Sequence, residues 1–412
     1  MNDELTTRLS RQLHDQVDDW HDTPLTLAGV QGRARTIRRR RQAIGTGAVA
    51  AAVLAVAIPV GVGLGDRTDS APRPTNPSPT RVVDGQAPTP RADGSFALDV
   101  LEAPTGEVPR SGYLSTGDDL LHTPQGAQDL PGDFVQLRRF GDGWIGLRAG
   151  EFPESHGTQL VRLDDSFAVT ADVLAAALVV DRAGERAAWV EVDGKDWTLV
   201  QATPAGVTTR TAVESDTQLI GFLTDGSVVA SSLATGQNVF SVVDPAGEAT
   251  PFGEGLLNVR SVSEAAGVVS ALSRYRDDLQ LEPCSVVVDP VSEAESFETC
   301  DFQPRAFSPD GTLVAAFSAY GDGLGSPELA VLDAATGDPL VRWSSGRDRQ
   351  SPATVQSVVW EDDDTLLATV TEGNEQTVIR AELDGALEQV AEPVQVEMSI
   401  AYRFPQAIWN VD

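Results

Sequence analysis

The chain has 412 residues, a formal net charge of −31 and two cysteines. Residues 1–42 carry eight Arg against six acidic residues, so the whole acidic excess lies in the segment from residue 66 onward. Because nucleic-acid binding needs a positive surface, this balance excludes nucleic acid as a partner of the C-terminal part.

Residues 1–42 are predicted to form an amphipathic, basic head. An apolar stripe recurs there at helical spacing and consists of Leu5, Leu9, Leu13, Val17 and Trp20. One helix cannot bury this stripe alone, so it packs on a second helix, lies on the membrane surface or binds a partner. In arrangement the head resembles those of actinobacterial single-span anti-sigma-like proteins, although their zinc-binding His-x-x-x-Cys-x-x-Cys motif is absent.

Residues 43–65 form an uncharged run of 23 residues. As a helix this run is roughly 35 Å long, enough to cross a hydrocarbon core of about 30 Å. A cluster of basic residues lies just before it, formed by Arg38, Arg39, Arg40 and Arg41. The positive-inside rule then places the N-terminus in the cytoplasm and the C-terminal part outside. We predict a single-pass protein of the cell membrane.

A cleaved signal peptide is the alternative interpretation of this run. Ala55 and Ala57 have the spacing of a cleavage site, but the apolar run continues to Leu64 and is preceded by a long segment.

The next segment, 66–93, is rich in Pro and Thr and has no apolar periodicity. It is predicted to be an extended linker outside the membrane.

From residue 94 to 412 the sequence consists of short β-type runs separated by turn residues. One turn register recurs every 41 to 53 residues and ends at Gly143, Gly184, Gly226, Gly267, Gly311 and Asp364, with Asp310 before Gly311. A second register follows each of these turns, for example at 204–206 and 333–337. Two turn registers at this period predict four strands per unit, which is the size of a propeller blade.

The segment Ser-Pro-Asp-Gly at 308–311, with the strand after it and the Ala-Thr-Gly turn at 335–337, resembles WD-repeat-like and TolB-like β-propellers. The resemblance covers 94–412 and implies an all-β fold, although the Trp-Asp dipeptide of a standard WD repeat is absent.

Lys195 is the only Lys in a chain rich in Ala, Gly, Val and Arg. With the propeller, this composition resembles that of an actinobacterial membrane protein.

Six units are clear in the sequence, and the termini are predicted to share a seventh. Residues 401–412 repeat the first hairpin of a unit in outline, and 95–111 repeat the second. We therefore predict a β-propeller of seven four-stranded blades, with six or eight as alternatives, behind an N-terminal transmembrane α-helix. Closure of this kind would protect the edge strands.

Cys284 and Cys300 flank one predicted hairpin outside the membrane. The turn near 290–293 puts them at opposite positions on neighbouring strands, so we predict a disulfide between them. Two free thiols, or pairing with another chain, are the alternatives.

Catalytic signatures are missing from the sequence. His122 and His156 have no partner at metal-ligand spacing, and neither a Gly-x-Ser-x-Gly elbow nor a phosphate-binding loop occurs. The acidic run 362–364 and Asp310 fit solvated turns. We therefore predict no catalytic, cofactor-binding or metal-binding residues and no cofactor.

The favoured function is a non-enzymatic binding or protein-interaction module at the cell envelope. Its partner would be an envelope protein or a glycan on the propeller face. The main alternative is a transmembrane sensor whose head binds a cytoplasmic transcription regulator. A propeller hydrolase or dehydrogenase is the third.

Overall fold

The computed structural model describes residues 88–116, 118–149, 158–234, 237–276, 282–319, 325–346, 352–396 and 401–404. All of them belong to one compact unit, Val83–Asp412. Within these ranges the chain forms strands and no α-helix, and no helix there could cross a membrane. The predicted head, the span 43–65 and the basic cluster Arg38–Arg41 lie outside the described residues.

Seven strands form one antiparallel sheet in chain order. They are β5 (Phe134–Phe140), β6 (Gly143–Arg148), β7 (Thr158–Leu163), β8 (Val169–Val180), β9 (Ala187–Asp193), β10 (Asp196–Thr203) and β11 (Gly206–Val213). β8 has 12 residues; its first half, up to Ala175, pairs with β7, and its second half pairs with β9. The sheet therefore divides at β8 into two units of four strand segments.

Four further sheets follow along the chain. The first is β12 (Gln218–Phe222), β13 (Val228–Ala234), β14 (Gln237–Val243) and β15 (Ala249–Phe252), and the second is β16 (Asn258–Ser263), β17 (Val268–Tyr275), β18 (Pro283–Val288) and β19 (Glu295–Thr299). The third is β20 (Phe302–Phe307), β21 (Leu313–Ser318), β22 (Glu328–Asp333) and β23 (Pro339–Ser344), and the fourth is β24 (Thr354–Trp360), β25 (Thr365–Glu372), β26 (Glu375–Glu382) and β27 (Leu387–Gln389), with β28 (Val394–Gln395) also on β26.

The last sheet joins the two ends of the propeller. Its order is β29 (Tyr402–Arg403), β2 (Tyr113–Ser115), β3 (Leu120–Thr123) and β4 (Gly126–Asp129). The N-terminal end supplies three strands and the C-terminal end supplies one, which pairs antiparallel with β2. We call the region where these ends meet the seam.

The predicted hairpin over 95–111 is wrong. β1 (Phe96–Ala97) instead pairs in parallel with β23, and Thr105 forms a parallel bridge with Gln389. Residues 91–106, which we call the strap, thus run along the outer edges of two sheets. Leu98 and Val100 in the strap are fully buried, which explains why this segment packs on those edges rather than folding on itself.

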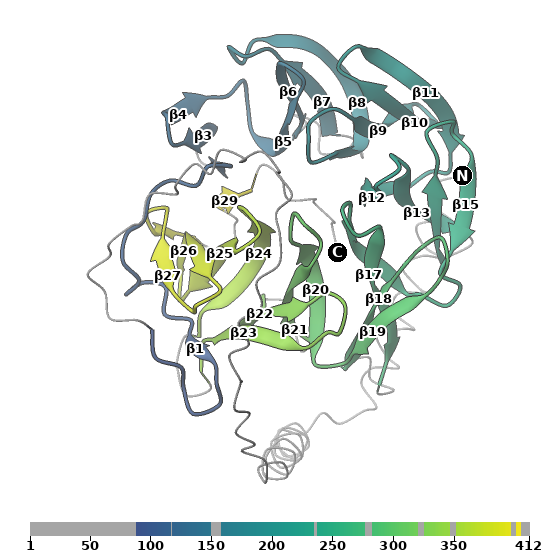
Figure 1. Cartoon of the computed structure of the whole chain (residues 1–412). Coiled ribbons are helices and arrows are strands. Elements are labelled where there is room, and N and C mark those ends of the chain that lie inside the picture. Colours follow the sequence, from purple (N-terminus) through teal and green to yellow (C-terminus); the bar gives the residue numbers. More distant parts are fainter. Residues whose placement is uncertain are drawn as a thin grey trace, which may run out of the picture. The chain divides into compact units, whose positions relative to one another are not determined.

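Seven hydrophobic clusters occupy the described part of the chain, and each contains residues from two neighbouring units. The first strands of successive units, β8, β12, β16, β20 and β24, contact one another in turn. Arg403 of β29 closes the circle through an ion pair with Asp133, just before β5. The sheets therefore lie around a common centre, as Figure 1 shows, and form a β-propeller.

A β-bulge recurs in the first strand of six units. The register shifts at Val135, Ala176, Ile220, Arg260, Arg305 and Gln356. A bulge bends a strand and increases its twist. The bulges give these six units the same bend at the strand that contacts the neighbouring units.

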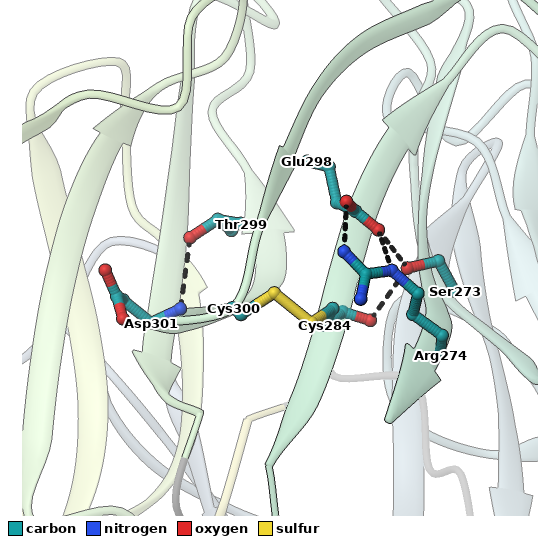
Figure 2. The surroundings of a disulfide bond; sticks show 7 residues. All are labelled: Ser273, Arg274, Cys284, Glu298, Thr299, Cys300 and Asp301. Atoms are coloured by element: carbon teal, nitrogen blue, oxygen red, sulfur yellow. Dashed lines mark hydrogen bonds and ion pairs between the residues drawn. A yellow bond between two sulfur atoms is a disulfide. The ribbon is translucent and has the colours of Figure 1, made fainter. Parts of the chain in front are cut away.

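The predicted disulfide between Cys284 and Cys300 is confirmed, with the two Cα atoms 4.0 Å apart. Ser285 pairs with Thr299, so the two cysteines directly adjoin the last pair of the β18–β19 ladder. Figure 2 shows that Arg274, on the neighbouring strand β17, forms an ion pair with Glu298 beside the bond, at 2.9 Å. The disulfide therefore links β18 and β19 covalently at the open end of this hairpin.

Replacing Cys300 by Ala should lower the free energy of unfolding by about 3 kcal/mol, because the bond restricts the unfolded chain. Denaturant titrations with and without a reducing agent would measure the loss. The reductant should destabilise the unaltered protein and leave the variant unchanged. Equal stability of the unaltered protein under both conditions would show that the bond contributes nothing.

Candidate functional site

A cavity of about 800 Å³ lies at the seam. Its walls come from four stretches far apart in the sequence, namely 105–108, 113–122, 389–396 and 401–402. Ligand pockets of proteins usually have volumes of roughly 300–1,000 Å³. We call this cavity the seam pocket and take it as the candidate functional site.

The strand register explains which side chains face the seam pocket. Tyr113 and Ser115 are two residues apart on β2, so they share one face of the sheet. His122 lies opposite Tyr113 on β3, and Tyr402 lies opposite Ser115 on β29. The alternate residue Leu114 faces the other way, into the cluster with the β5–β7 strands.

Three rings that line the seam pocket pack together. Tyr113 and His122 are stacked with ring centroids 4.6 Å apart, and Tyr402 meets Tyr113 edge-on at 5.4 Å. The Tyr402 hydroxyl donates a hydrogen bond of 2.6 Å to the carbonyl of Glu392. Burial, and then the nearby Tyr113, Glu392 and Asp118, raise the pKa of Tyr402 to about 12. The phenol therefore stays protonated and fixes the 389–396 segment against β29.

A hydroxyl network lies next to the rings. The Ser115 hydroxyl donates to the carboxylate of Asp118, and Nε2 of His122 lies 3.2 Å from the Ser115 Oγ. Since a hydroxyl has one proton, His122 donates from Nε2 to Ser115 in this arrangement. In a Ser-His-Asp catalytic triad the carboxylate binds the imidazole and the imidazole accepts the serine proton. Here the carboxylate binds the serine instead, so the order of the hydrogen bonds differs from that of a triad.

Burial lowers the pKa of His122 below its ordinary value of 6.5, against the opposing effect of Asp118. The unfolded chain therefore takes up a proton at this residue more readily, and the stability that depends on neutral His122 falls as the pH drops below about 6.5. We expect the loss of unfolding free energy between pH 7 and pH 5 to be smaller in the variant His122→Gln. Urea titrations of both proteins at both pH values test this, and equal losses would contradict it.

The structure places the predicted turn residues away from the seam pocket. Gly184, Gly226, Gly267, Gly311, Asp310 and Asp364 lie in loops that join the first and second strands of a unit, and Gly143 is the first residue of β6, directly after such a loop. These loops touch one another around the propeller: Gly141 donates to the carbonyl of Gly184, and Thr224 Oγ1 donates to the carbonyl of Glu264. They connect neighbouring units rather than forming a site.

Asp310 is engaged within its own turn. Its carboxylate accepts hydrogen bonds from the Ser308 hydroxyl at 2.7 Å and from the Thr312 amide at 3.0 Å. The Ser308 hydroxyl, followed by the Thr312 amide, lowers the pKa of Asp310. In the described residues no group of three or more His, Cys, Asp or Glu could hold a metal ion.

Sequence reasoning missed the seam pocket, although part of its signal is local. The run 113–123 has a pair of apolar residues on each side of the polar stretch 115–119, which is typical of a hairpin, and the structure places His122 opposite Tyr113. From the sequence alone, His122 can be judged only as a possible metal ligand. The other walls, 389–396 and 401–402, cannot be assigned to the site without the ring closure.

No family model matches the chain, and no curated protein matches it. Among solved structures, it is similar to the β-propeller domain of Cps50 (Swd1) from Myceliophteria thermophila, with 9% identity over 64% of this chain and 86% of that one, at a TM-score of 0.44. The β-propeller domain of the Trilobed protease from Pyrococcus furiosus is 11% identical over 63% and 84%, also at 0.44. TolB from Acinetobacter baumannii is 14% identical over 66% and 67%, at 0.39.

Proposed function

We propose that this protein is a membrane-anchored, non-enzymatic binding module of the cell envelope, and that its seam pocket holds the ligand. The observation that carries the proposal is the pocket itself, which combines a suitable volume with a hydroxyl network whose bonding order differs from that of a triad. Binding sites of this kind have a few polar groups that orient a ligand within a mostly preformed cavity.

A propeller of seven blades belongs to this proposal. Dividing the seven-stranded sheet at β8 gives two blades, and the other five sheets give one each. The seven hydrophobic clusters between neighbouring units support the same count. The chain would then use β29 to close the seventh blade, and the seam pocket lies at this closure.

The anchoring rests on the sequence alone. The uncharged run 43–65 and the four arginines before it support a single span with the propeller outside the cell. The apolar stripe of the head leaves two roles for residues 1–42, contact with the membrane surface or with a cytoplasmic regulator. The second role would make the protein a sensor.

A crosslinking pull-down from native membranes tests the function. It compares the full chain, a chain without residues 1–22, and the variant Thr116→Trp, which places an indole in the seam pocket. Thr170→Trp on the exposed half of β8 is the matched control. We expect envelope partners that persist without the head and are lost only with Thr116→Trp.

Two results would contradict this proposal in different ways. A cytoplasmic regulator that disappears with residues 1–22 would establish the sensor function instead. Envelope partners that bind Thr116→Trp and Thr170→Trp equally well would show that the seam pocket is not the binding site.

A further inference from the structure

Two carboxylates from distant parts of the chain line the seam pocket. Asp118 belongs to the loop between β2 and β3, and Glu392 belongs to the segment after β27. Both side chains are exposed to solvent. Both carboxylates are near the same two rings, since each of them raises the pKa of Tyr113 and of Tyr402, after the larger effect of burial.

No positive charge of the lining balances these carboxylates. The lining residues include neither Lys nor Arg, and His122, the one basic side chain among them, has a lowered pKa and is neutral at pH 7. Arg403 of β29 is directed to the other side of the sheet, where it pairs with Asp133 at 3.1 Å. The side chains that line the seam pocket therefore carry a net negative charge.

The remaining wall offers apolar surface beside the carboxylates. Val108, Val390, Val394 and Ala401 line the cavity, together with the edges of the tyrosine rings. A ligand that matches both features has a positive head and a short aliphatic body. Aliphatic surface gains free energy on leaving water, and a cation is attracted by both carboxylates and by the rings.

We propose that the seam pocket binds a small alkylammonium ion, with its head between Asp118 and Glu392 and its chain against the valines. This inference rests on the proposed binding function and specifies its ligand class. An anion of the same size would be repelled by the two carboxylates. A neutral molecule would gain only the contact with the apolar wall.

Three probes of matched size test the charge requirement on the full-length protein. They are butylammonium, 1-butanol and pentanoate, which share a butyl group, and their binding is measured by ligand-observed NMR titration. We expect butylammonium to bind about tenfold more tightly than 1-butanol, because two exposed ion pairs contribute modestly each. Pentanoate should bind more weakly than the alcohol.

Three variants locate the effect. Asp118→Asn and Glu392→Gln should each reduce the preference for butylammonium from about tenfold to about threefold. Asp119→Asn is the matched control. It removes the same charge at the next residue, whose side chain does not line the cavity. Its left-handed backbone, with φ of 55°, also suits Asn.

The outcomes separate this inference from the function on which it rests. Equal binding of the ammonium and the alcohol, stronger binding of pentanoate, or no binding of butylammonium would each overturn the ligand class. None of these results affects the envelope pull-down, which tests the binding function independently. A preference for butylammonium that survives Asp118→Asn and Glu392→Gln would place the cation elsewhere and overturn the inference as well.

Discussion

Replacing Arg380 by Met should lower the free energy of unfolding by about 3–5 kcal/mol, because it leaves two buried carboxylates without their cation. Arg380 contacts Glu361 at 2.7 Å and Glu388 at 3.1 Å, and the three side chains are only 12%, 4% and 13% exposed. Glu361 also accepts a hydrogen bond of 2.6 Å from the Arg110 amide, just beyond the strap. The cluster thus joins the β24–β27 sheet to the N-terminal end of the propeller.

Arg210→Met provides the control for this substitution. Arg210 pairs with Glu191 at 2.6 Å, but its side chain is 53% exposed. Exposed pairs contribute little, so this variant should lose less than about 1 kcal/mol. Denaturant titrations of both variants give the comparison. Equal losses would show that burial does not distinguish the two ion pairs.

Replacing Gln376 by Met should destabilise the protein by about 2–5 kcal/mol and loosen the closing strand. Gln376 is 2% exposed, and its Oε1 accepts hydrogen bonds from the amides of Ala401 at 2.8 Å and Tyr402 at 3.1 Å. Methionine has a similar shape but cannot accept them. The two amides would then remain buried without a partner, and β29 should separate from the sheet.

Hydrogen exchange over residues 401–404 measures this loosening, and Gln201→Met is the matched control. Gln201 is also buried and donates to the carbonyl of Asp244 at 2.8 Å, far from β29. Both variants should lose stability, but only Gln376→Met should accelerate exchange at the C-terminal strand under native conditions. Unchanged protection there would show that Gln376 does not hold β29.

The repeating turns could be predicted because they depend on local chemistry. Gly184, for example, has a positive φ of 70°, and a Cβ there would lie 2.8 Å from the carbonyl oxygen of Arg139. Such a position needs glycine in every unit that packs this way, so the period appears in the sequence. The disulfide was predictable for a related reason, since the hairpin between its cysteines is continuous in sequence.

The bulges, the strap and the seam pocket have no comparable signal. The bulge residues range from Ala176 through Ile220 to Arg260, so no residue type marks the shared bend. The strap pairs with strands more than 240 residues later, as in the hydrogen bond from Arg91 to the carbonyl of Ser344. Contacts of this kind depend on the closed ring, which local sequence patterns do not encode.

The strap also determines how the propeller would respond to mechanical tension. A pull on the N-terminal side of residue 88 first meets the hydrogen bond from Arg91, then the two-residue pairing of β1 with β23. It then meets the hydrogen bonds that Gln389 forms with Pro104 and Gly106. These attachments lie in series along the chain, so they would yield one after another. Breaking these attachments would take up the applied mechanical work before the force reaches β2 and the seam pocket.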